Sequence, residues 1–179
     1  ATVSTKHKNR FRFEHGGRLI YEWEQTLSEV ILYIPTPPGI NKKNQMIVEI
    51  GPNHLVVALR GATQRYLDED TGSLVVVDES TWYLEDNEDY RSEPNAGEMV
   101  LVVNLQKMAK AQTWSCALRG AERKNANSEL DALSQEEVRK QMMRERFQEE
   151  HPHFDFSDAD FNGQVPDPRN FMGGVRYGQ

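Results

Sequence analysis

The chain has 179 residues, of which 37% are hydrophobic and 27% charged, and its net charge is −7. This length suits one domain with appended segments, and the acidic balance disfavours nucleic acid, whose phosphate backbone it would repel. Cys116 is the single cysteine, which excludes an internal disulfide and favours a reducing compartment. No apolar run is long enough for a membrane span or a signal core, so we expect a protein without membrane contact.

The first 18 residues are basic, in contrast to the rest of the chain. This stretch contains five Lys and Arg residues and one acidic residue, Glu14, so its net charge is +4. We interpret residues 1–18 as a flexible, solvated basic arm that precedes the folded part.

Short segments rich in β-branched and apolar residues follow, separated by turn signals such as Gly51-Pro52-Asn53 and Asp70-Thr71-Gly72. The predicted strands occupy residues 19–25, 29–34, 46–50, 55–59, 74–77, the segment 78–86 around Trp82, and 99–105. No helical pattern lies between them, so a parallel βαβ unit does not fit. The fold class is therefore all-β: residues 19–120 form an antiparallel β-sandwich of seven to eight strands.

The segment D-E-S-T-W-Y-L-E-D at 78–86 tests this interpretation, because it combines large aromatics with acidic residues. In a strand, Trp82 and Leu84 point to one side and Tyr83 points to the other. We therefore assign Trp23, Trp82 and Leu84 to the core and Tyr83 to the outside. Replacing either tryptophan by alanine should cost about 3–5 kcal/mol by forming a cavity.

Residues 121–151 form a predicted C-terminal helical segment. Ser134-Gln135-Glu136-Glu137 has capping-box spacing, and a narrow apolar stripe follows it: Val138, Met142, Met143 and Phe147. The stripe can pack on its own domain, on a twin helix in a homodimer through 135–150, or in a partner groove. Pro152 ends the helix, and residues 152–179 are predicted to be irregular and partly disordered, with phenylalanines that dock back or bind a partner.

The chain lacks the residue patterns that catalysis or metal binding requires. Cys116 has no histidine near it in sequence, which favours a buried structural thiol. His151 and His153 lack a fourth metal ligand, and the acidic residues 68–70 lack EF-hand spacing and are expected to face solvent. We predict a protein that is not an enzyme and has no metal or cofactor.

Six spaced motifs occur in order: Y-E-W-E-Q-T-L-S-E-V, P-P-G, V-V-A-L-R-G, G-S-L, E-S-T-W-Y-L-E-D and L-V-V-N-L-Q-K with a later tryptophan. Together they resemble the CS domain, the β-sandwich of small co-chaperones and of the nuclear-distribution protein C (NudC) family. The resemblance covers residues 19–163. It departs at the acidic stretch 87–97, where the family has a tight turn, and after Gln164, where the match is loose.

The resemblance implies a co-chaperone that binds heat-shock protein 90 and stabilises unfolded clients. One client would be the WD-repeat lissencephaly protein of the dynein pathway, in the cytoplasm and also at the nucleus or centrosome. It also implies contact residues at the end of the last strand, Lys107 and Trp114, although core packing is an alternative for Trp114. The second candidates for client contact or dimerisation are Phe147, Phe154 and Phe156.

Three other functions stay open at this point. An ATP-independent holdase would need no chaperone contact, and a dimeric dynein-pathway adaptor would pair through residues 135–150. A carbohydrate- or ligand-binding sandwich would use an exposed face of aromatic residues. Its candidate residues are scattered over several strands and loops, which weighs against it: Tyr33, Tyr66, Tyr83 and Tyr90.

Overall fold

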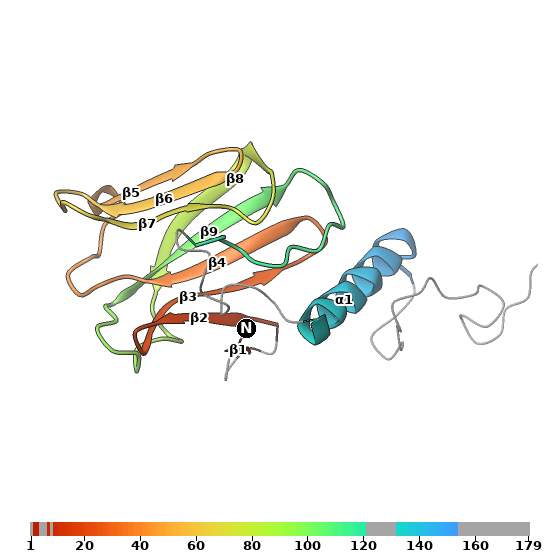
Figure 1. Cartoon of the computed structure of the whole chain (residues 1–179), viewed down its shortest axis with the longest axis horizontal. Coiled ribbons are helices and arrows are strands. Elements are labelled where there is room, and N and C mark those ends of the chain that lie inside the picture. Colours follow the sequence, from red (N-terminus) through yellow and green to blue (C-terminus); the bar gives the residue numbers. More distant parts are fainter. Residues whose placement is uncertain (1, 4–6, 8, 121–131, 154–179) are drawn as a thin grey trace, which may run out of the picture.

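A computed structural model describes residues 2–3, 7, 9–120 and 132–153. Two antiparallel β-sheets pack face to face, and a C-terminal helix lies at one end of them (Figure 1). The predicted sandwich with an appended helix is thus confirmed. The helix carries charged residues along its whole length, and no helix in the described part of the chain is apolar enough to cross a membrane.

The larger sheet has six strands in the order β1-β2-β3-β4-β9-β8. Their bounds are Thr2–Val3 (β1), Phe11–His15 (β2), Arg18–Gln25 (β3), Glu29–Pro35 (β4), Met99–Lys107 (β9) and Val75–Asp86 (β8). The two predicted segments, 74–77 and 78–86, are one edge strand, β8, whose pairing with β9 is interrupted between Val76 and Thr81.

The smaller sheet has three strands in the order β5-β6-β7. Their bounds are Met46–Ile50 (β5), His54–Leu59 (β6) and Arg65–Asp70 (β7), and a short 3₁₀ helix, η1 (Lys43–Gln45), precedes them. The predicted hairpin over Gly51–Asn53 is confirmed, since Ile50 pairs with Leu55 across it. Strand β7 was missed, because R-Y-L-D-E-D has only one fully buried apolar side chain, Leu67.

The core lies between the two sheets and follows the alternation of the strands. Trp23, Leu32 and Leu101 point inward and are almost fully buried, so the core assignment of Trp23 is confirmed. Apolar side chains on the opposite face of the larger sheet form a second cluster that includes Val102 and Tyr90. Both faces of this sheet therefore carry packed apolar residues near its centre.

Trp82 and Leu84 are less buried than predicted. Both are only partly buried at the margin of the core, and the Lys43 ammonium group lies 4.4 Å from the centre of the Trp82 ring. The reason is that β8 is an edge strand, so its inward side chains have a neighbouring strand on one side only. Tyr83 points outward and is 43% exposed, as expected.

The predicted flexible arm over 1–18 is wrong, because Thr2–Val3 form β1, which pairs with β2, and the arm's second half forms β2 itself. Strand β2 pairs with β3 from Phe11↔Trp23 to His15↔Arg18. Phe11 and Phe13 alternate with polar residues and pack on the core, a period-2 pattern that the basic charge of the segment masked. Burial of the two rings outweighs the solvation of the neighbouring cations.

Helix α1 spans Ala132–Glu150, within the predicted helical segment. Its buried residues Ser134, Val138 and Met142 recur every four positions and face the sandwich. His151 donates its backbone N–H to Phe147 at 2.9 Å, and Pro152 then prevents a further turn. Residues 121–131 and the tail from 154 onward lie outside the described residues.

Candidate partner-binding site

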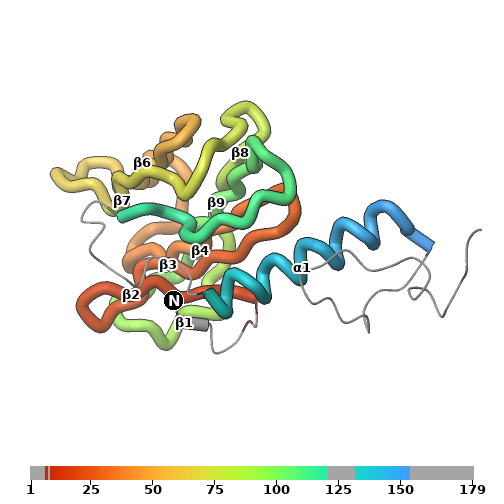
Figure 2. The backbone as a smooth tube through the Cα atoms, turned by 45° about the vertical axis from the view of Figure 1, so that its right-hand side comes forward, coloured from red at the N-terminus to blue at the C-terminus, as the bar shows by residue number. Residues whose placement is uncertain are grey.

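Helix α1 runs along one end of the sandwich and extends beyond it, next to the chain segments that follow β3 and β9 (Figure 2). The carboxylate of Glu145 accepts a hydrogen bond from the Leu27 backbone N–H at 3.0 Å. The Lys110 ammonium group lies 3.0 Å from the carboxylate of Glu149. These polar contacts lie on the C-terminal side of the apolar contact of Val138 and Met142, and together the two kinds of contact hold the helix on the sandwich.

Lys107 lies beneath this contact. It is the last residue of β9, its side chain points inward, and only 3% of it is exposed. Its ammonium group donates to Gln25 Oε1 at 3.0 Å, to the Thr26 carbonyl at 2.7 Å and to the Gln112 carbonyl at 2.8 Å. Three acceptors satisfy this cation, whose charge would otherwise be costly to bury.

Gln25 completes the arrangement and connects it to Trp114. Its side-chain amide donates to the Trp114 carbonyl at 2.8 Å, and its Oε1 accepts from the Trp114 N–H at 2.9 Å. The Sδ atom of Met142 covers the Lys107 ammonium group at 3.5 Å. Burial lowers the pKa of Lys107 to about 8, and the carboxylate of Glu145 opposes that shift.

The predicted contact residues Lys107 and Trp114 are therefore not on the surface. Trp114 is 1% exposed and belongs to the core, so the alternative of core packing is the one that the structure supports. Lys107 follows the inward alternation of Val103 and Leu105, and helix α1 closes the end of the sheet above it. In this conformation neither side chain can reach a partner.

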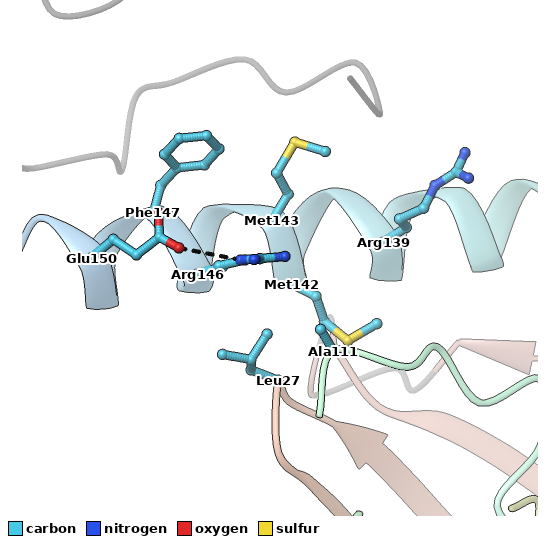
Figure 3. A pocket seen from close by; sticks show the side chains of 8 residues that line it. All are labelled: Leu27, Ala111, Arg139, Met142, Met143, Arg146, Phe147 and Glu150. Atoms are coloured by element: carbon cyan, nitrogen blue, oxygen red, sulfur yellow. Dashed lines mark hydrogen bonds and ion pairs between the residues drawn. The ribbon is translucent and has the colours of Figure 1, made fainter. Parts of the chain in front are cut away.

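A groove about 340 Å³ in volume lies where α1 meets the sandwich (Figure 3). Leu27, Ala111 and Met142 lie between the helix and the strands, while Met143 and Phe147 point away from the sandwich. Its lining is completed by three charged side chains of α1, Arg139, Arg146 and Glu150. The groove offers apolar contact beside cationic groups, which suits an apolar peptide segment with acidic residues.

The structure thus brings one predicted contact residue, Phe147, to this groove, whereas Phe154 and Phe156 lie outside the described residues. Sequence reasoning missed Leu27 and Ala111. They lie in two loops 84 positions apart, and their spacing carries no helical or strand periodicity that would have linked them. Only the docking of α1 makes them neighbours.

The outer face of the larger sheet carries three of the four tyrosines considered for a binding face. Tyr33, Tyr83 and Tyr90 all lie on it, so they are not scattered as the sequence suggested, whereas Tyr66 is on β7. The Arg10 guanidinium group lies 3.6 Å from the centre of the Tyr33 ring, and burial raises the pKa of Tyr33 to about 12. Of these three rings only Tyr83 is exposed, which disfavours an aromatic binding face.

The acidic segment 87–97 folds over this face. The Tyr90 hydroxyl donates to the buried carboxylate of Glu22 at 2.8 Å, and Arg12 contacts Glu22 at 3.3 Å and Glu93 at 2.8 Å. Arg10 pairs with Asp89 at 3.5 Å. The segment 87–97 therefore pairs with Arg12 of β2 and with Arg10 just before it rather than projecting into solvent.

The acidic residues 68–70 lie in β7 and surround a histidine of β6. His54 contacts Asp70 at 2.8 Å and Asp68 at 2.5 Å, and these hydrogen bonds raise the pKa of the imidazole. Among the described residues no group of three or more His, Cys, Asp or Glu side chains could hold a metal ion.

The fold is a β-sandwich closed at one end by a helix, with a groove where the two meet. Among known proteins, residues 19–89 match the CS domain family, the family that the sequence motifs resemble. The similar proteins include NudC proteins.

Human NudC domain-containing protein 2 is 29% identical over 142 residues, which cover 79% of each chain. The nuclear movement protein nudc of Schizosaccharomyces pombe is 26% identical, with coverage of 78% of this chain and 92% of that protein. The crystal structure of mouse NudC domain-containing protein 2 is 24% identical, covers 84% of this chain and 99% of that one, and has a TM-score of 0.38.

Proposed function

We propose that this chain is a non-enzymatic co-chaperone that binds heat-shock protein 90 and stabilises client proteins. Its clients would include the WD-repeat lissencephaly protein of the dynein pathway. The names of its relatives support the pathway, since they include a nuclear movement protein and a nuclear migration protein. The observation that carries the proposal is the apolar, partly cationic groove that α1 forms on a CS domain.

The chemistry of the groove fits a protein partner better than a small ligand. Methionine side chains are flexible and polarisable, so the partly exposed Met143 can adapt to different apolar surfaces. Phe147 offers an aromatic anchor of the kind that dominates binding energy at interfaces. A site that must accept several clients needs this adaptability more than it needs fixed hydrogen bonds.

A second candidate is a dimeric adaptor or an ATP-independent holdase, which the exposed apolar residues of α1 favour. Leu133 is 72% exposed, and Met143 and Phe147 are only partly covered. However, an antiparallel pairing of two α1 helices about Met143 would bring Glu136 of one copy to Glu150 of the other. The two glutamates would repel each other across such an interface. The helix therefore suits a different partner better than its own copy.

Calorimetric titration against purified heat-shock protein 90 tests the proposal. It should be run without nucleotide and with a non-hydrolysable ATP analogue, because chaperone conformation depends on nucleotide. We expect micromolar binding that Phe147→Ser weakens at least about tenfold, the loss of one buried aromatic anchor. The matched control is Leu133→Ser, on the same helix but outside the groove, which should leave the affinity unchanged.

Absence of binding in both nucleotide states would reject the chaperone contact. Suppression of client aggregation in the same sample would then identify a holdase. A molar mass of twice 20.6 kDa in light scattering, reduced to 20.6 kDa by Met143→Glu, would instead identify the dimeric adaptor.

A further inference from the structure

Residues 154–161 read F-D-F-S-D-A-D-F and lie outside the described residues. They begin directly after the described part of the chain, which ends at His153 past the C-terminus of α1. Three phenylalanines and three aspartates in eight positions combine apolar rings with negative charge. This composition is complementary to the groove beside α1.

The groove has both apolar side chains and cationic groups, which match the rings and the aspartates of the segment. Leu27, Ala111 and Met142 supply apolar surface at its floor. Arg139 and Arg146 line it with side chains that are 58% and 63% exposed. Each already contacts a glutamate of the same helix, but such exposed pairs are weak, and each guanidinium group has five N–H donors. Both guanidinium groups can therefore donate hydrogen bonds to further carboxylates.

The distances allow the chain to return to the groove. From Arg139 to Glu150 the helix rises about 17 Å, at 1.5 Å per residue. Eight extended residues span about 27 Å, so a chain that reverses after Pro152 can follow the whole groove. Phe154 and Phe156 would then lie on the same side of the extended segment, with Asp155 on the other.

We infer that residues 154–161 bind in the groove of the same molecule, with the phenylalanine rings on its apolar floor and the aspartates near Arg139 and Arg146. Covalent attachment gives such a segment a high effective concentration, so a weak intrinsic affinity is enough. In the absence of a partner, residues 154–161 therefore occupy the groove. A partner that uses the groove must displace the segment, and its apparent affinity is reduced by the occupied fraction.

Methionine methyl NMR on the full chain tests this inference. The sequence has six methionines, of which Met142 and Met143 report on the groove and Met46, in β5 of the smaller sheet, serves as the remote reference. A spin label is attached through Asn162→Cys, directly after the segment. The native Cys116 is buried and has little access to the reagent. We expect loss of most of the Met143 signal, while the Met46 signal persists.

The matched control carries Phe154→Ser and Phe156→Ser in the labelled chain, and it should recover the Met143 signal. Arg139→Gln with Arg146→Gln should recover it in part, and added salt should do the same by screening the ion pairs. Equal intensity for Met143 and Met46 in the labelled wild-type chain would overturn the inference. So would broadening that arises only when labelled and isotope-enriched chains are mixed, because the occupant is then a second copy.

The inference does not depend on the identity of the partner, and the two proposals fail separately. If the segment docks but the chaperone does not bind, the co-chaperone function is wrong and the docking stands. If both hold, Phe154→Ser with Phe156→Ser should tighten chaperone binding, because the competing segment is removed. Weaker binding of that variant would mean that these rings contact the partner themselves, which contradicts internal occupation.

Discussion

The Lys107 ammonium group donates a hydrogen bond of 3.0 Å to the side-chain oxygen of Gln25, and the same oxygen accepts the backbone N–H of Trp114 at 2.9 Å. One glutamine thus joins the end of β3, the end of β9 and the loop that carries Trp114. The docked helix then covers this group through Met142. A lysine that the sequence suggested for partner contact instead holds together the surface on which α1 packs.

Lys107→Ala should lower the free energy of unfolding by about 3 kcal/mol. The substitution removes the Lys107 donor from the buried side-chain oxygen of Gln25 and from the partly buried carbonyl groups of Thr26 and Gln112, and an unsatisfied buried group costs roughly 1–3 kcal/mol. The control is Lys110→Ala, which removes only an exposed pair with Glu149 and should change the stability by less than about 1 kcal/mol. Urea unfolding measures both, and equal values for the two variants would contradict the buried role.

The wild-type chain and Lys107→Ala should differ in the pH dependence of their stability. The pKa of Lys107 is lowered from 10.5 to about 8 in the folded chain. Between these values the unfolded chain keeps the proton and the folded chain has lost it, so a rise in pH favours folding. The stability advantage of the wild-type chain over Lys107→Ala should grow from pH 8 to pH 10, by about 1 kcal/mol per pH unit. A constant difference in urea unfolding would mean that Lys107 stays charged when folded.

Tyr90→Phe should destabilise the chain although the ring stays in place. The Tyr90 hydroxyl is a hydrogen-bond donor to Glu22, whose side chain is fully buried, and its loss leaves that carboxylate short of a partner. We expect a loss of about 1–3 kcal/mol. Tyr83→Phe, on the exposed part of the same face, is the control and should have little effect on the melting temperature. An equal response of both variants would show that segment 87–97 is not anchored through Tyr90.

Trp23→Ala and Trp82→Ala should separate clearly in thermal or urea unfolding. Trp23 is 2% exposed, and its removal should cost about 3–5 kcal/mol by leaving a cavity. Trp82 is half-buried on an edge strand under Lys43, so its truncation should cost about 1–2 kcal/mol, which follows from the smaller apolar area lost. If Trp82→Ala cost as much as Trp23→Ala, the strand would have to pack more deeply than the structure places it.

Much of this molecule could be predicted from local patterns in the chain. Alternation at 21–25 and 99–105, the turn at Gly51–Asn53 and the helical spacing of Val138 and Met142 determined the sandwich, the burial of Trp23 and the helix that follows. These features are local because each depends on the repeat of a strand or helix, 2 or 3.6 residues, which neighbouring residues alone express. The spaced motifs added the resemblance to the CS-domain β-sandwich.

Only the tertiary structure decided which surfaces are free. Strand β2 forms because its two phenylalanines pack on the core. Segment 87–97 folds back because its acidic residues pair with Arg10 and Arg12 on the outer face of the larger sheet. Lys107 is buried because Met142 of α1, 35 positions later, covers the end of β9. Each outcome depends on contacts between segments far apart in the chain, and its free energy is a balance of burial and charge pairing that no local pattern contains.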